Sequence, residues 1–139
     1  MGICYLVGAM ETRFPIRRKP GDMIIAADGG YRSLLSLGVK PDLVVGDFDS
    51  LGYVPQDVET VQVPVRKDDT DMLLAAQEGL KRGYDRFMLV GGMGGRLDHT
   101  LGNFQVLAWL AERGARGAMA GPRETAIILR NDKAVVFYN

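Results

Sequence analysis

Residues 41–50 read PDLVVGDFDS, an apolar run followed directly by a glycine and by two aspartates on either side of a phenylalanine. A short run of branched apolar residues that stops at glycine and aspartate is typical of a buried β-strand. Two other apolar runs also lead into polar or glycine-rich segments, ADGG at 27–30 and GGMGG at 91–95. Short strands with polar or glycine-rich ends point to a small α/β sheet.

Apolar runs predict strands at 3–7, 23–27, 43–46, 60–63, 86–90 and 117–120. Helical spacing of apolar residues predicts helices at 31–37, 70–81 and 99–113, followed by Gly38, Gly83 and Gly114. Asp98 is expected to cap the last helix. Continuous apolar strands separated by helices predict a three-layer, Rossmann-like, mostly parallel sheet covered on both faces.

The tail of the chain departs from this rhythm. Two strand patterns, 125–130 and 134–138, are joined by Asn-Asp-Lys and predict a C-terminal β-hairpin. Such a hairpin is either an edge addition to the sheet or the start of a further unit. We therefore divide the chain into an α/β domain at 1–121 and a hairpin at 122–139.

Composition restricts the function classes. The 139 residues include 17 basic and 17 acidic side chains, so no basic excess is available for long nucleic acid. The single cysteine, Cys4, lies in an apolar run and is expected to be buried in a strand. One cysteine excludes a disulfide framework, and a cytoplasmic location is expected. No apolar run approaches the ~20 residues of a membrane span.

Asp47 and Asp49 are candidate metal ligands. In an extended segment both side chains point to the same side, which suits one hard cation such as Mg²⁺. The alternative is an Asx-type turn, in which the carboxylates bond to local backbone. Because the pair follows an apolar strand and Gly46, we favour the cation site.

Residues 67–71, KDDTD, gather three aspartates at the start of the second predicted helix. Helix capping and the helix dipole account for one or two acids there. Asp71 is expected to reach the metal of Asp47 and Asp49, and Lys67 to meet a phosphate. The alternative is a solvated helix start.

The glycine-rich loop 91–95 follows an apolar strand and precedes Arg96 and Asp98. Glycines let backbone N–H groups approach a phosphate, and arginine suits phosphate oxygens. The loop matches neither a Walker A motif nor Gly-x-Gly-x-x-Gly, so a plain turn remains an alternative. His99 is the sole histidine, and the absence of Cys or His companions argues against zinc.

Taken together and in this order, the motifs ADGG at 27–30, PDLVVGDFDS at 41–50, KDDTD at 67–71 and GGRLDHTLGN at 94–103 resemble those of thiamine pyrophosphokinases. The resemblance spans about residues 1–121. It implies magnesium ligands, chiefly Asp47, Asp49 and Asp71. It also implies Asp71, Asp98 and Arg96 as catalytic residues. The expected nucleotide-binding residues are Asp28, Gly29, Gly30, Lys67, Asp68, Thr70, Gly91, Gly92, Gly94, Gly95, His99 and Asn103.

The resemblance further implies transfer of a diphosphate group from ATP to the hydroxyl of thiamine, with Mg²⁺ and with Asp71 or Asp98 as proton acceptor. Family members usually continue into a β-sandwich domain that contributes thiamine contacts and pairs subunits, so residues 122–139 are expected to begin that domain and the longer protein to form a homodimer. Two alternatives stay open: a Mg²⁺-dependent phosphohydrolase with Asp47 as nucleophile, and a nucleotide-binding module without turnover.

Overall fold

The computed structural model of the chain describes residues 2–10, 15–49, 51–63, 69–121 and 123–128. Lys67, Asp68 and the predicted strand 134–138 lie outside these ranges, and so do the expectations attached to them.

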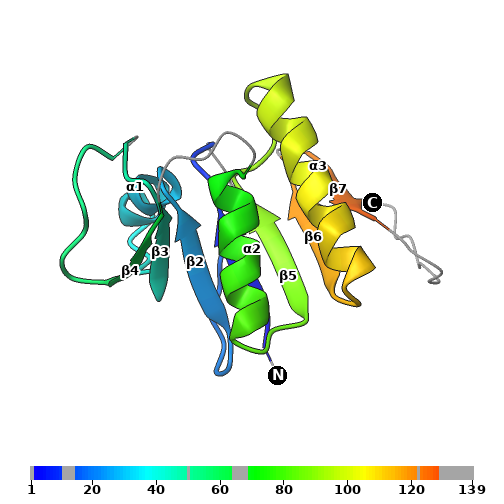
Figure 1. Cartoon of the computed structure of the whole chain (residues 1–139), viewed down its shortest axis with the longest axis horizontal. Helices are drawn as coiled ribbons and strands as arrows, with labels where there is room; N and C mark the ends of the chain where they lie inside the picture. The colour runs from blue at the N-terminus through cyan, green and yellow to red at the C-terminus, as the bar shows by residue number, and fades with distance from the viewer. Residues whose placement is uncertain (1, 11–14, 50, 64–68, 122, 129–139) are drawn as a thin grey trace.

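The described chain forms seven strands with three helices between them (Figure 1). The strands are β1 (Cys4–Val7), β2 (Met23–Ala27), β3 (Leu43–Gly46), β4 (Glu59–Gln62), β5 (Arg86–Val90), β6 (Arg116–Ala120) and β7 (Thr125–Ile127). The helices are α1 (Gly30–Ser36), α2 (Asp71–Lys81) and α3 (Leu97–Glu112). The strands form a single sheet of order β4-β3-β2-β1-β5-β6-β7, in which only β7 runs antiparallel to its neighbour.

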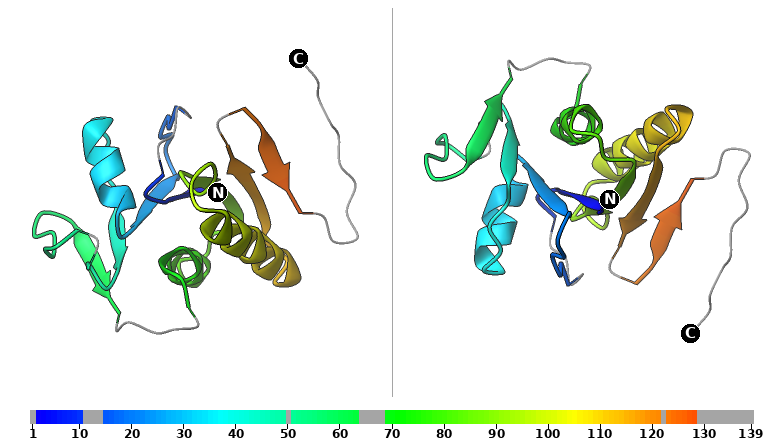
Figure 2. Two further views of the ribbon diagram at one scale, coloured as in Figure 1. Left: turned by 90° about the horizontal axis from the view of Figure 1, so that it is seen from above. Right: turned by 90° about the horizontal axis from the view of Figure 1, so that it is seen from below.

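The sheet lies between two helical layers, with α1 on one face and α2 and α3 on the other (Figure 2). One apolar cluster lies beneath α2 and α3, and a second lies beneath α1. The predicted three-layer, mostly parallel α/β fold is therefore confirmed. Cys4 is fully buried in β1, where desolvation raises the pKa of its thiol to about 12, as expected of a packed strand cysteine.

The start of α3 and its capping residue differ from the sequence prediction. Asp98 does not cap α3, because Arg96 occupies the N-cap position with extended backbone and Asp98 lies inside the first turn. The helix begins two residues earlier than its apolar spacing suggested. At α2 the cap is Thr70, whose Oγ1 accepts a hydrogen bond from the Leu73 amide at 3.1 Å.

The β7 strand extends the sheet at its edge, with Ile127 opposite Ala118 of β6. The division of the chain at residues 121 and 122 stays a prediction. In the part of the chain that the structure describes, no helix has both the length and the apolar character needed to cross a bilayer.

The order of the strands places a crevice beside β1. The chain passes from β1 through β2 and β3 to β4 on one side, then crosses back through α2 to β5 and β6 on the other. In open parallel sheets, ligands bind at the carboxyl ends of the strands where the winding reverses in this way. A ligand site is therefore expected at the end of β1 and in the neighbouring loops.

Candidate active site

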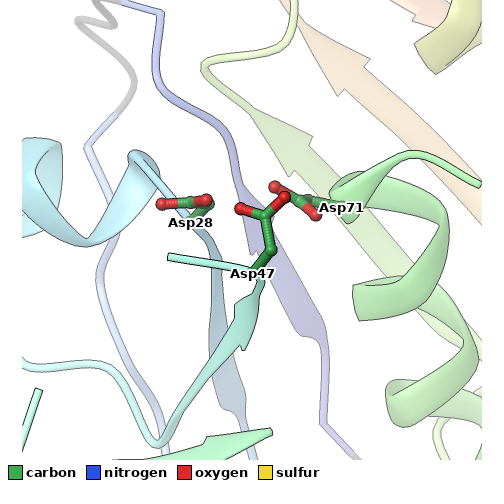
Figure 3. Close-up of side chains that lie close together, drawn as sticks. All are labelled: Asp28, Asp47 and Asp71. Carbon is green, nitrogen blue, oxygen red and sulfur yellow. The ribbon is translucent and has the colours of Figure 1, made fainter. Parts of the chain in front are cut away.

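Three carboxylates converge at the carboxyl ends of the strands (Figure 3). Asp28 follows β2, Asp47 follows β3 and Asp71 is the first residue of α2. One oxygen from each lies within 4.8 Å of the others. At an effective dielectric near 20, two negative charges about 5 Å apart repel by roughly 3 kcal/mol. Three carboxylate oxygens at this spacing suit a hard divalent cation, which offsets the repulsion.

Asp28 is held in place by the backbone around it. It is only 3% exposed and adopts a φ of 39°, a conformation that aspartate tolerates better than most residues. Its amide donates to the Val45 carbonyl at 2.8 Å, which joins the ends of β2 and β3. Gly46 makes this approach possible, because a Cβ there would lie 3.0 Å from the Asp28 Cβ.

The geometry of Asp47 and Asp49 differs from the expected one. Phe48 has a φ of 67°, so residues 47–49 are not extended. The expectation that an extended backbone points the two carboxylates to the same side therefore does not hold. Asp47 Oδ1 accepts the Asp49 amide at 2.9 Å, which is the Asx-type turn of the alternative interpretation. Buried Phe48 and Leu51 anchor this turn. Asp49 is exposed and lies outside the group of three, and its role as a ligand stays a prediction.

The pKa of Asp71 is shifted by its burial and by the neighbouring carboxylates. Desolvation, followed by the charges of Asp28 and Asp47, a hydrogen bond with Asp28 and the charge of Asp49, raises the pKa of Asp71 to about 6. The carboxyl group thus resists ionisation because its neighbours are acidic. A bound cation would reverse this effect by favouring the charged form.

A cavity of about 480 Å³ opens beside the three carboxylates. Seven of the residues proposed from the sequence line it: Asp28, Gly29, Thr70, Asp71, Asp98, His99 and Asn103. Gly30, Arg96 and the four proposed loop glycines are not among its lining residues. The cavity therefore gathers acids from α2 and α3 with the end of β2.

Packing explains several glycines of that loop. Gly91 has a φ of 72°, and a Cβ there would lie 2.6 Å from the Gly8 carbonyl oxygen. A Cβ at Gly95 would collide with the Met10 side chain. Gly30, at the start of α1, would similarly collide with the Val7 carbonyl. Gly30 and Gly91 need glycine because a Cβ there would meet backbone atoms, whereas the end of the Met10 side chain can move away from position 95. Contact of these positions with a nucleotide stays a prediction.

Arg96 and Asp98 form an exposed pair at the start of α3, with Arg96 Nη2 2.8 Å from Asp98 Oδ2. Desolvation raises the pKa of Asp98, but the His99 amide and the charges of Arg96 and His99 outweigh it and hold this pKa below its usual value. Asp98 is therefore ionised under conditions in which Asp71 retains a proton.

Comparison with known proteins places the chain in a family. The sequence model described as "Thiamin pyrophosphokinase, catalytic domain" matches residues 18–118. The chain belongs to the thiamin pyrophosphokinase family. A curated thiamine pyrophosphokinase of Bacillus subtilis (strain 168) is 36% identical over 89 residues, which cover 60% of this chain and 42% of that protein.

Solved thiamin pyrophosphokinases share the fold. The protein from Geobacillus thermodenitrificans superposes with a TM-score of 0.67 at 28% identity, covering 85% of this chain and 59% of that one. The Bacillus subtilis structure gives a TM-score of 0.68 at 25% identity, covering 86% and 60%. The chain thus spans less than half of the curated relative and about 60% of these solved structures.

Sequence reasoning missed one wall of the cavity in this family member. Gly8, Ala9 and Met10, directly after β1, line it. Their amides join the neighbouring loop, since Gly8 N donates to the Val90 carbonyl and Met10 N to the Gly91 carbonyl. No acidic or basic residue marks this segment. The rule that ligands bind at the carboxyl ends of parallel strands would have found it if applied to the first strand as well.

Proposed function

We propose that the protein containing this chain transfers a diphosphate group from ATP to the hydroxyl of thiamine, giving thiamine diphosphate and AMP. Its family membership supports the reaction. The observation that carries the proposal for this chain is the convergence of Asp28, Asp47 and Asp71 beside a cavity of about 480 Å³ at the carboxyl ends of the strands. Phosphoryl-type transfer depends mainly on positioning and on neutralising charge.

The three carboxylates fit Mg²⁺ by their chemistry, because the ion prefers carboxylate oxygens together with water and phosphate oxygens. We assign Asp47 and Asp71 as ligands, with Asp28 completing the group; a ligand role for Asp49 stays a prediction. Bound Mg²⁺ would neutralise charge on the phosphate oxygens. In this arrangement the chain's own residues fix the ion beside the cavity that receives the nucleotide.

The transfer itself breaks the bond between the α,β-bridging oxygen and the β-phosphorus. The thiamine hydroxyl oxygen attacks that phosphorus, AMP leaves with the bridging oxygen, and the hydroxyl proton passes to a carboxylate. Asp98 and Asp71 both line the cavity and are the two candidate acceptors. Asp71 is ionised once a cation is bound, whereas Asp98 is kept ionised by Arg96 and the His99 amide.

Arg96 is proposed to hold phosphate oxygens together with loop amides. The Arg96 side chain is 74% exposed and forms an ion pair with Asp98. Exposed ion pairs contribute little to stability. Exchanging Asp98 for a phosphate therefore costs little, and arginine binds phosphate through two parallel hydrogen bonds.

Calorimetry on this chain tests the nucleotide half of the proposal. ATP should bind with Mg²⁺ present and much more weakly with EDTA, and thiamine should bind little to this chain by itself. Asp71→Asn should abolish the Mg²⁺-dependent part. Asp85→Asn is the matched control, because Asp85 is an exposed acid just before β5, at the amino end of that strand and away from the carboxyl ends where the three carboxylates lie. A Mg²⁺-dependent part of ATP binding in Asp71→Asn as large as in wild type would contradict the assignment.

Release of AMP in the presence of thiamine, followed in the longer protein, tests the transfer. AMP formation that depends on thiamine separates the transferase from a binding module. A phosphorylated aspartate trapped at Asp47 would instead indicate the phosphohydrolase. The family match gives that alternative no support.

A further inference from the structure

A buried hydrogen bond ties the β5–α3 loop to the middle of α3. Asn103 Nδ2 donates to the Gly92 carbonyl oxygen at 2.8 Å. The asparagine is 8% exposed, and its partner precedes it by eleven residues. Since a carbonyl oxygen only accepts, the amide nitrogen must face Gly92. Breaking such a bond leaves a buried carbonyl without its partner, which is costly.

The Asn103 side chain leaves no room for a side chain at position 92. A Cβ at position 92 would lie 2.7 Å from Asn103 Nδ2 and 3.3 Å from its Cγ. Gly92 does not have a positive φ, so its backbone conformation does not by itself require glycine. The two residues therefore form a matched pair, in which the amide side chain occupies the space of the missing Cβ.

The tie acts on the wall of the cavity. Asn103 lines the cavity together with Asp98 and His99 from the first turn of α3. On the other side, the Met10 amide donates to the Gly91 carbonyl at 2.9 Å. The successive carbonyl groups of Gly91 and Gly92 are thus held from two sides, the first by the segment after β1 and the second by α3. Both of these segments line the cavity.

We propose that Asn103 is a positioning residue of the nucleotide site, which acts by holding Gly92 and with it the β5–α3 loop against α3. This inference rests on the proposed function, because it assumes that the cavity receives ATP. It assigns Asn103 a role through the loop, beyond lining the cavity. Loss of the bond should weaken Mg-ATP binding about tenfold, the effect of roughly 1.4 kcal/mol.

The first test replaces Asn103 by leucine, which has nearly the same shape, favours helices and cannot donate a hydrogen bond. Asn103→Leu should weaken Mg-ATP binding about tenfold in calorimetry. It should also speed amide hydrogen exchange in residues 91–96. Gln105→Leu is the matched control, because Gln105 is exposed on the same helix. Unchanged affinity in Asn103→Leu, with wild type binding normally, overturns this inference alone.

A double-mutant cycle separates positioning from packing and covers the case in which leucine disturbs the fold. Gly92→Ala should lower Tm, because its methyl group meets Asn103. Adding Asn103→Ala should make room and restore part of the lost Tm, while Mg-ATP affinity stays weak because the tie is missing. Recovery of affinity together with Tm in the double variant would overturn the proposal. A wild-type chain that fails to bind Mg-ATP would overturn the proposed function and this inference with it.

Discussion

Asp71 and Asp98 occupy nearly the same position in their helices, but their pKa values are shifted in opposite directions. Each lies in the first turn of a helix, α2 or α3, and each lines the same cavity. Desolvation and the charges of Asp28 and Asp47 raise the pKa of Asp71 to about 6. The pKa of Asp98 is lowered, although desolvation opposes this, through the His99 amide and the charge of Arg96.

The difference comes from the partners that the fold supplies. The partners of Asp98, Arg96 and His99, are its neighbours in sequence. Those of Asp71 arrive from the ends of β2 and β3, more than twenty residues away. A helix N-terminus favours a negative charge by about 0.3–1 kcal/mol, which is less than the repulsion between close carboxylates. The distant acids therefore decide the state of Asp71.

The largest expected effect is on cation affinity. Asp71→Asn should weaken Mg²⁺ binding by about a hundredfold or more, because the attraction between a carboxylate and a divalent ion a few ångströms away is worth several kcal/mol. The rise of Tm with added MgCl₂ measures this effect. Asp85→Asn should retain the wild-type response. A full Mg²⁺ response in Asp71→Asn would show that the cluster is not a cation site.

The stability of the metal-free chain should depend on pH through Asp71. Its folded-state pKa, about 6, lies above the ordinary 3.8, so its contribution is present below pH 4 and lost as pH rises through 6. The full shift corresponds to about 3 kcal/mol, and solvent screening of this half-exposed group reduces it to roughly 1–2 kcal/mol. Urea unfolding between pH 4 and 8 measures it.

In Asp71→Asn this pH slope should vanish, and the variant should be more stable than wild type at pH 7 without metal. Saturating Mg²⁺ should remove the loss in wild type above pH 6, because it favours the ionised form. A slope that persists unchanged in Asp71→Asn would assign the titration to another group.

Gly46→Ala changes the cluster without changing any charge. The added Cβ would lie 3.0 Å from the Asp28 Cβ and would occupy a backbone with a φ of 156°. We expect a loss of about 1 kcal/mol in the free energy of unfolding, with Mg²⁺ affinity lowered several-fold as Asp28 shifts. Denaturant unfolding and the Mg²⁺ response of Tm measure the two effects. Gly38→Ala is the comparison for the backbone term, since a Cβ at Gly38 meets nothing within 4 Å.

The smallest effect is expected at Asp98. Asp98→Asn removes an exposed carboxylate whose ion pair with Arg96 contributes little. Mg²⁺ affinity should change by less than about twofold, and Tm should stay at the wild-type value. A large loss of Mg²⁺ affinity in this variant would place Asp98 in the cation site and remove the contrast with Asp71.

Local pattern was sufficient for the elements and for much of the site. The run LVVG at 43–46 and the helix that ends at Lys81 appear where apolar spacing placed them. Asp71 was expected to lie near Asp47, and the structure places both carboxylates in one group. The start of α3 and the extended form of residues 47–49 were wrong. They depend on the N-cap at Arg96 and on the positive φ of Phe48, which residue type does not reveal.

By itself the sequence determined that this chain is a mostly parallel α/β sheet with acidic and glycine-rich segments at the carboxyl ends of its strands. Period and composition are local properties that survive without knowledge of the partners. Only the tertiary structure decided that Asp28, and not Asp49, completes the group with Asp47 and Asp71. It also decided that Gly92 leaves room for the Asn103 side chain and accepts its hydrogen bond. Distances between side chains from different strands depend on register and on individual backbone angles, and no spacing along the chain encodes them.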